Sequence, residues 1–281
     1  MTTTSIYKTP EGQQRVMALY DAVLARWPVP YEALKVATRH GETAIIASGE
    51  KSAPPLLLLH GSSSNATAWI GDMEAYSRQF RVYAVDTLGE PGKSAPNRPP
   101  WDGPAFADWL EDVLAALQVA KVSLVGISQG GWLALKFATS RPERVEKLVL
   151  LAPGGVAQVK ASFLLRALTL RLFGRRGAEA IDRIVMGRDA VPEEAVRYMN
   201  VIMTNFRPRV EAQALYSDEA LQRLTMPVML IAGLQDALFP SAQTAARLQK
   251  SVPHLSAHHL PEAGHVLHNT AGQILPFLAA A

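Results

Sequence analysis

Short, continuously apolar runs alternate with amphipathic stretches along most of the chain. An apolar run without polar interruption is typical of a strand that is buried on both faces. Six strands are predicted, at 55–60, 81–86, 121–128, 145–153, 225–233 and 254–260, and those at 55–60 and 81–86 are of this buried kind. The stretches between them, such as 104–117 (PAFADWLEDVLAAL), repeat their apolar residues at helical spacing. This alternation predicts a parallel sheet that helices cover on both sides, the α/β class.

The first part of the chain has a different pattern. Residues 11–27 predict a helix that ends before Pro28 and Pro30. The runs at 31–38 and 42–48 flank Arg39-His40-Gly41 and predict a hairpin. The two strands of this hairpin, added to the six strands above, predict a mostly parallel sheet of eight strands.

The alternation stops between residues 154 and 224. This segment shows no convincing strand, and residues 161–173, 178–186 and 192–203 read as helices. We therefore expect three parts: 1–153 and 225–281 form one α/β core, and 154–224 form a helical cap inserted after the sixth strand. The stretch FLLRALTLRLFGRR (163–176) mixes leucines with arginines. The favoured interpretation packs its apolar stripe on the core; the alternatives are an acyl-pocket lining and, ranked last, a membrane-surface helix.

Composition narrows the function. The 281 residues carry a net charge of only +3, without a compact basic run or a stacking motif, so nucleic acid is not an expected partner. The absence of cysteine excludes disulfides, thiolate nucleophiles and cysteine-based zinc sites. Neither a secretory h-region nor an apolar run of about 18 residues is present. We expect a cytoplasmic protein without stable membrane association; a homodimer is left open.

One serine stands at a strand-to-helix junction. The segment GISQGG places Ser128 between Gly126 and Gly130, after an apolar run and before a helical one. This is the context in which Gly-x-Ser-x-Gly forms a nucleophile elbow, whose strained backbone needs small neighbours. The alternative is a glycine-rich turn in which the serine caps the helix.

A serine nucleophile needs a base, and the base needs an acid that orients it. Asp236 directly follows the predicted strand at 225–233, and His265 follows the last predicted strand. Asp236 could instead cap the next helix, and His265 is one of seven histidines. The joint order Ser, Asp, His favours a catalytic set.

An acyl-transfer reaction also needs N–H donors for the oxyanion. We expect one from the backbone of Gln129, next to the serine, and the other from Ser62 in the loop that follows residues 55–60. Trp132, Met199, Met203 and Phe206 are candidates for the substrate pocket, although each could equally be core. Trp69 is expected to anchor its helix.

These motifs together resemble the α/β-hydrolase family, and most closely its bacterial serine carboxylesterases. The matching segments follow the family's order: LLLLHGSSSNATAW (56–69), VDTLGEPGKS (85–94), LVGISQGGWLAL (124–135), LIAGLQDALFP (230–240) and LPEAGHV (260–266). The resemblance implies hydrolysis of a small-molecule ester through an acyl-enzyme, without cofactor or metal. It leaves open carbon–carbon bond hydrolysis or a lyase reaction with the same residues, and a non-catalytic ligand-binding homologue.

Two features refine the resemblance. Haloalkane dehalogenases and epoxide hydrolases of this fold carry aspartate at the elbow, so Ser128 argues against both. Many relatives have an Asp-x-x-Gly-x-Gly-x-Ser loop, whereas residues 86–94 (DTLGEPGKS) have one extra residue between the glycines. We expect that loop to keep its role as a turn with an altered shape near the pocket.

Overall fold

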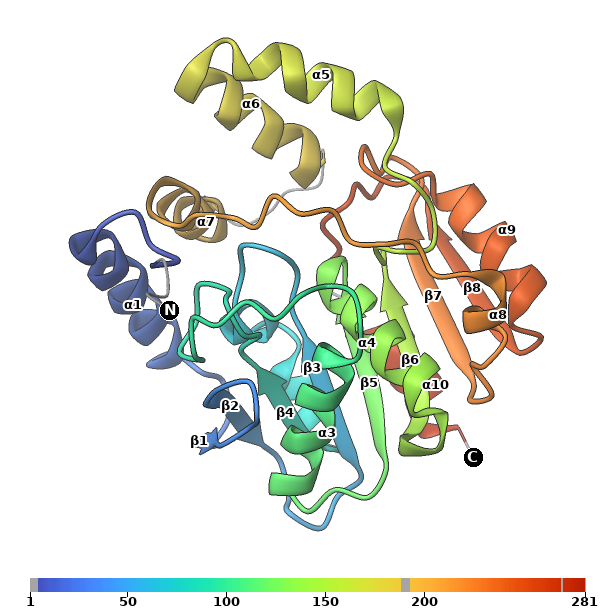
Figure 1. The fold of residues 1–281 in the computed structure, drawn as a ribbon. Coiled ribbons are helices and arrows are strands. Elements are labelled where there is room, and N and C mark those ends of the chain that lie inside the picture. Colours follow the sequence, from blue (N-terminus) through green and yellow to red (C-terminus); the bar gives the residue numbers. More distant parts are fainter. Residues whose placement is uncertain (1–4, 188–192, 269, 281) are drawn as a thin grey trace.

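A single eight-stranded sheet forms the centre of the computed structural model, which describes residues 5–187, 193–268 and 270–280. The strand order is β1-β2-β4-β3-β5-β6-β7-β8 (Figure 1). β2 is antiparallel to β1 and β4, and the other neighbouring pairs are parallel. The strands are β1 (Tyr31–Val36), β2 (Thr43–Ser48), β3 (Pro55–Leu59), β4 (Arg81–Val85), β5 (Val122–Ile127), β6 (Val145–Leu151), β7 (Val228–Gly233) and β8 (Leu255–Leu260). The predicted fold class is confirmed, including the hairpin, in which Val36 pairs with Thr43.

Helices cover both faces of the sheet because side chains alternate along each strand. Leu57 and Leu59 of β3 join one core with α3 (Ala105–Ala116), α4 (Gln129–Ser140), α8 (Asp218–Leu221) and α9 (Ser241–Ser251). Leu56 and Leu58 join the opposite core with α1 (Pro10–Leu24), α2 (Met73–Ser77) and α10 (Ala271–Ala279). All four leucines are fully buried, as a strand between two helical layers requires.

The stretch between β3 and β4, which the strand–helix alternation predicts as a single helix, forms two separate pieces. A 3₁₀ helix, η1 (Ala66–Trp69), precedes α2, and Gly71 lies between them. Glycine is a poor helix former, and the buried Asn65 side chain caps η1 by accepting the Thr67 N–H at 3.1 Å. Trp69 is buried in the second core, in line with its predicted anchoring role. A second 3₁₀ helix, η2 (Pro142–Arg144), leads into β6.

The chain between β6 and β7 carries α5 (Ala161–Arg171), α6 (Gly174–Met186), α7 (Glu193–Asn205) and α8. Ile202 of α7 and Phe206 beside it pack with Ile6, Tyr7 and Val16 in a small third core. A backbone bond from Lys8 to Asn205 (2.8 Å) helps to fasten α7 to the N-terminal segment.

In contrast, α5 has no buried residue, and Figure 1 shows α5 and α6 above the rest of the molecule. The prediction that the leucines of α5 pack on the core is wrong, because Leu164 and Leu168 are 56% and 65% exposed. Among the described residues, no helix combines the length and apolarity needed to cross a bilayer.

Candidate active site

Ser128 occupies a sharp turn between β5 and α4. Its φ of 53° and ψ of −113° are strained for a residue with a side chain. A Cβ atom on Gly126 would lie 2.4 Å from the Gly130 oxygen, and one on Gly130 would lie 2.1 Å from the Leu59 oxygen. Only glycine fits at these two positions, so the turn can expose the serine hydroxyl while its flanks stay in tight contact with the sheet.

The structure brings Ser128, His265 and Asp236 together although they are far apart in the sequence. His265 Nε2 lies 2.9 Å from Ser128 Oγ, and His265 Nδ1 lies 2.9 Å from Asp236 Oδ2. Asp236 and His265 are 1% and 5% exposed, and Ser128 is half-buried. Each follows the end of a strand, namely β5, β7 or β8, at the edge of the sheet where ligands bind in open α/β folds.

Asp236 fixes the protonation pattern of this group. Its Oδ1 accepts the backbone N–H groups of Leu238 (2.7 Å) and Phe239 (3.0 Å), which holds the carboxylate in one orientation. Because an ionised carboxylate only accepts hydrogen bonds, Nδ1 of His265 must donate to Oδ2. In a neutral imidazole Nε2 is then an acceptor, so the Ser128 hydroxyl donates to it.

The loop after β3 lies against the elbow, where the oxyanion donors are expected. A Cβ atom on Gly61 would lie 3.6 Å from Ser128 Cβ. Two residues after Gly61, the backbone N–H of Ser63 donates to the Glu90 side chain at 2.7 Å. It is therefore not free to bind an oxyanion. Within the described part of the chain, the Ser62 and Gln129 N–H groups donate to no protein acceptor. They remain the two predicted donors.

The acceptor for Ser63 is Glu90, a residue that sequence reasoning missed. Glu90 is 1% exposed; its Oε2 accepts the Ser63 N–H, and its Oε1 accepts Gln129 Nε2 at 3.0 Å. One buried carboxylate thus links the two segments that carry the predicted oxyanion donors. Burial raises the pKa of Glu90 to about 7. The sequence signal was the extra residue between Gly89 and Gly92, because Glu90 and Pro91 fill that interval.

Asp86 secures the rest of the same loop. This fully buried carboxylate accepts the N–H groups of Ala66 and Lys93, both at 2.7 Å, and the Tyr20 hydroxyl at 3.1 Å. Desolvation raises the pKa of Asp86. The loop therefore keeps its turn role despite its extra residue, and it connects η1, α1 and the oxyanion segment.

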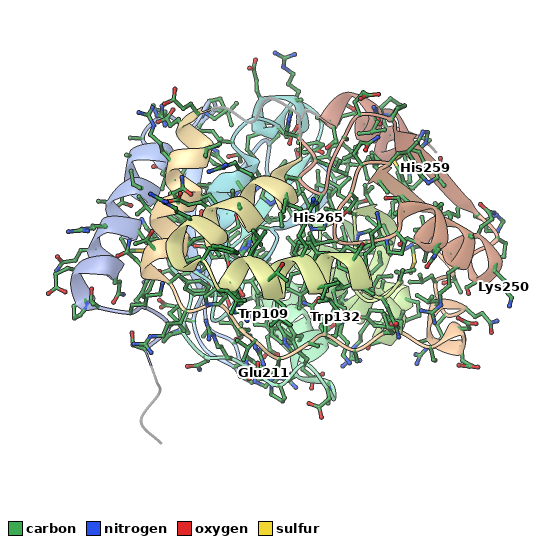
Figure 2. The ribbon with its side chains drawn as sticks, turned by 90° about the horizontal axis from the view of Figure 1, so that it is seen from above. Trp109, Trp132, Glu211, Lys250, His259 and His265 are labelled. Atoms are coloured by element: carbon green, nitrogen blue, oxygen red, sulfur yellow. The ribbon has the colours of Figure 1, made fainter. Side chains whose placement is uncertain are left out.

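Two of the predicted pocket residues belong to the core instead. Trp132, labelled in Figure 2, is 1% exposed and donates from Nε1 to the Ala214 oxygen at 2.9 Å. Its ring belongs to an aromatic cluster with Trp101, Phe106 and Tyr216. Phe206 is fully buried against Tyr7 in the third core. Met199 and Met203, half-buried on α7, stay predictions.

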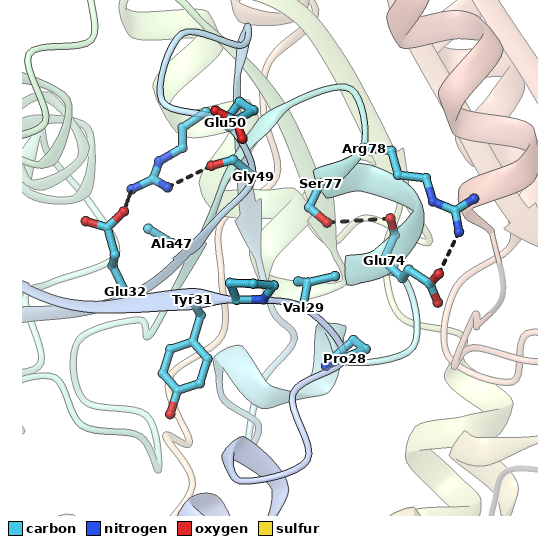
Figure 3. Close-up of a pocket in the computed structure, with 12 residues that line it drawn as sticks. Pro28, Val29, Tyr31, Glu32, Ala47, Gly49, Glu50, Glu74, Ser77 and Arg78 are labelled. Carbon is cyan, nitrogen blue, oxygen red and sulfur yellow. Dashed lines mark hydrogen bonds and ion pairs between the residues drawn. The ribbon is translucent and has the colours of Figure 1, made fainter.

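A surface depression of about 470 Å³ lies elsewhere (Figure 3). It is lined by Gly49 after β2, by Arg81 at the start of β4 and by α2. This is the edge of the sheet opposite to the one where Ser128 follows β5. Arg81 donates to Glu32 (2.8 Å) and to the Gly49 oxygen (2.9 Å), so its charge is already paired. This depression is separate from the candidate site.

Comparison with known proteins identifies the family of this chain. Residues 56–275 match the model of the alpha/beta hydrolase family. The carboxylesterase YbfK of Bacillus subtilis is 32% identical over 268 residues, which cover 92% of this chain and 89% of that protein. Its crystal structure superposes with a TM-score of 0.86 over 96% of this chain and 99% of that chain.

Two further relatives are informative. The crystal structure of naproxen esterase, also from Bacillus subtilis, gives a TM-score of 0.84 at 28% identity, over 96% of this chain and 99% of that chain. A 2-hydroxymuconate semialdehyde hydrolase of Pseudomonas is 29% identical over 232 residues, 75% of this chain and 80% of that protein. Fold, site and sequence similarity agree: this chain belongs to the alpha/beta hydrolase family.

Proposed function

We propose that this protein is a serine hydrolase that cleaves carboxylic esters through an acyl-enzyme intermediate. The observation that carries the proposal is the hydrogen-bonded series Asp236–His265–Ser128, with 2.9 Å at both links. The carboxylesterase relatives, similar over nearly the whole chain, favour an ester as the substrate.

The geometry supports the following steps. His265 Nε2 takes the proton from Ser128 as Oγ attacks the ester carbonyl, and Asp236 stabilises the imidazolium that forms. The N–H groups of Ser62 and Gln129 hold the oxyanion of the tetrahedral intermediate. His265 then gives its proton to the leaving alcohol, which departs and leaves an acyl group on Ser128. A water molecule, deprotonated by the same imidazole, releases the acid.

Glu90 is a positioning residue in this proposal. It does not reach the reacting atoms but fixes the peptide that follows Ser62 and the side chain of Gln129. Donors held in place before the reaction are worth more than donors that must reorganise during it. Glu90 would therefore raise kcat without contributing to substrate binding.

Substitution of the nucleophile tests the assignment. Ser128→Ala should abolish hydrolysis of p-nitrophenyl acetate and butyrate and should prevent labelling by a fluorophosphonate probe, because the proposed nucleophile is then missing. Ser77→Ala, a half-buried serine of α2 that lines the separate depression, is the matched control and should keep both. Full activity of Ser128→Ala would refute the proposal, and a wild-type protein that takes no label would favour a ligand-binding homologue.

Carbon–carbon bond hydrolysis is the second candidate, favoured by the similarity to the 2-hydroxymuconate semialdehyde hydrolase. Both reactions would use the same Ser128–His265 pair. A panel of p-nitrophenyl esters and vinylogous β-diketones, compared by kcat/KM, separates them. We expect preference for the esters; preference for the diketones would assign the second reaction.

A further inference from the structure

The outer face of α5 is an apolar patch that the described part of the chain leaves exposed. Leu164, Leu168 and Leu172 recur every four residues and share one face of the helix. With Leu165 and Phe173 they are 56–83% exposed, and they make up five of the nine large hydrophobic side chains that are exposed in the described part of the chain. We call these five residues the α5 patch. Contiguous exposed apolar surface of this kind marks an interaction site.

The segment that carries the α5 patch has charges of one sign. Residues 157–177 contain five basic residues and no acidic one, although the whole chain carries only +3. The five are Lys160, Arg166, Arg171, Arg175 and Arg176. Leucines flanked by arginines on one helix are typical of a helix that lies in a lipid–water interface.

The inner face of α5 is accounted for by the protein itself. Phe163, Ala167 and Leu170 are half-buried, on the side of the helix away from Leu164 and Leu168. In the view from above, α5 lies in front of the rest of the molecule (Figure 2). The leucines that face outward are therefore not needed for folding of the cap.

The α5–α6 pair is attached to the loops of the candidate site at both ends. Where α5 begins, Lys160 donates its backbone N–H to the Leu238 oxygen (2.8 Å) and its Nζ to the Asp236 oxygen (2.6 Å). Where α6 ends, Gly187 lies against Gly264, the neighbour of His265; a Cβ on Gly187 would be 2.9 Å from Gly264 Cα. A surface that binds α5 would thus lie over the candidate site.

We propose that the α5 patch docks reversibly on an anionic lipid surface and so presents the site to esters that partition into that surface. The leucines would enter the interface while the arginines meet lipid phosphates. A second copy of the chain fits less well, because a symmetric contact through this face would bring two basic segments together. The docking step stands on the α5 patch alone; only the delivery of esters rests on the proposed hydrolase function.

The test uses full-length Ser128→Ala protein, so that docking is measured without hydrolysis. Co-sedimentation compares vesicles of phosphatidylcholine with vesicles that also contain phosphatidylglycerol. We expect binding to the anionic vesicles that weakens as salt is added. The triple variant Arg166→Gln/Arg171→Gln/Arg176→Gln should bind roughly 100-fold more weakly, since each basic residue near an anionic surface contributes about a factor of five. The variant Leu164→Ser/Leu168→Ser/Leu172→Ser should also lose binding.

Matched controls change exposed residues away from the α5 patch: Arg15→Gln/Arg223→Gln for charge and Val210→Ser/Leu234→Ser for hydrophobicity. They should bind as the parent does. In active protein, the leucine variant should hydrolyse dissolved p-nitrophenyl acetate at the parental rate, which shows that it folds.

Three results would overturn the proposal: no binding to anionic vesicles, binding that survives both triple variants, or dimers in sedimentation velocity that the leucine variant dissociates without any vesicle binding. Wild-type protein that docks on the anionic vesicles but does not hydrolyse p-nitrophenyl esters would instead count against the proposed function.

Discussion

The interior of the candidate site and the outer face of α5 both reverse the usual distribution of polar and apolar groups. At the site, the carboxylates of Asp236, Glu90 and Asp86 are at most 1% exposed. On α5 and directly after it, four leucines are 56–83% exposed. The difference lies in their partners: the buried carboxylates each accept at least two hydrogen bonds from the protein, whereas α5 has no residue that the described part of the chain buries.

Polar groups are buried and apolar groups are exposed here for two different reasons. A buried carboxylate costs so much desolvation that it persists only when fixed donors surround it, and such fixed dipoles are what catalysis needs. An exposed leucine costs little stability, and it becomes useful when another surface covers it. The first region should therefore respond to mutation in its chemistry, and the second only in its interactions.

The largest expected effect comes from Asp236→Asn. The asparagine oxygen can still accept the Leu238 and Phe239 N–H groups, but its NH₂ then faces His265 Nδ1. The imidazole must carry its proton on Nε2, so it cannot accept the proton of Ser128. We expect kcat to fall about 10⁴-fold, the size seen for this change in serine proteases, with the thermal midpoint nearly unchanged. A loss below tenfold would remove Asp236 from the mechanism.

A pair of substitutions compares the residue that follows α7 with an exposed residue of α5. Phe206→Ala creates a cavity in the third core and should lower the free energy of unfolding by about 3–5 kcal/mol. Leu168→Ala removes a side chain that is 65% exposed and should change it by less than about 0.5 kcal/mol. Urea unfolding followed by circular dichroism gives both values. If both substitutions lowered the free energy of unfolding equally, Leu168 would be packed on the core in solution rather than exposed.

Stability should depend on pH through Glu90. Its pKa is about 7 in the folded protein against 4.5 for an ordinary glutamate. Between these values the folded protein holds a proton that the unfolded chain releases, so this contribution is present below pH 4.5 and is lost as the pH rises to 7. The loss is on the order of 3 kcal/mol. Glu90→Gln should lack this part of the slope when urea unfolding is repeated from pH 4.5 to 8; an unchanged slope would contradict the assignment.

The smallest effect concerns the role of Glu90 in catalysis. Glu90→Ala leaves Ser63 and Gln129 without their acceptor, so kcat should fall about tenfold while KM stays constant, since only donors to the oxyanion are displaced. Glu90→Gln keeps an acceptor for Ser63 and should recover part of kcat. Steady-state kinetics on p-nitrophenyl butyrate at saturating substrate provides the measurement. A change confined to KM, or no recovery in Glu90→Gln, would make Glu90 merely structural.

The local pattern of residues in the sequence predicts much of the fold and the candidate nucleophile. The apolar runs of β3 to β7 predict buried strands because a strand between two helical layers has no polar face, and the glycines around Ser128 predict the elbow because no larger residue fits. The sequence also predicts that Ser128, Asp236 and His265 lie close together. Each follows a predicted strand, and parallel strands that run in the same direction end at the same edge of the sheet.

Tertiary structure alone decided the rest. Trp132, Phe206 and the leucines of α5 are all apolar residues at helical spacing, yet the first two are buried in cores and the leucines face solvent. Periodicity shows that a helix has an apolar face but not what covers it, because burial depends on where distant segments pack. Glu90 is the sharpest case: a glutamate in a loop reads as exposed, and only the convergence of Ser63 and Gln129 around it makes a buried carboxylate tolerable.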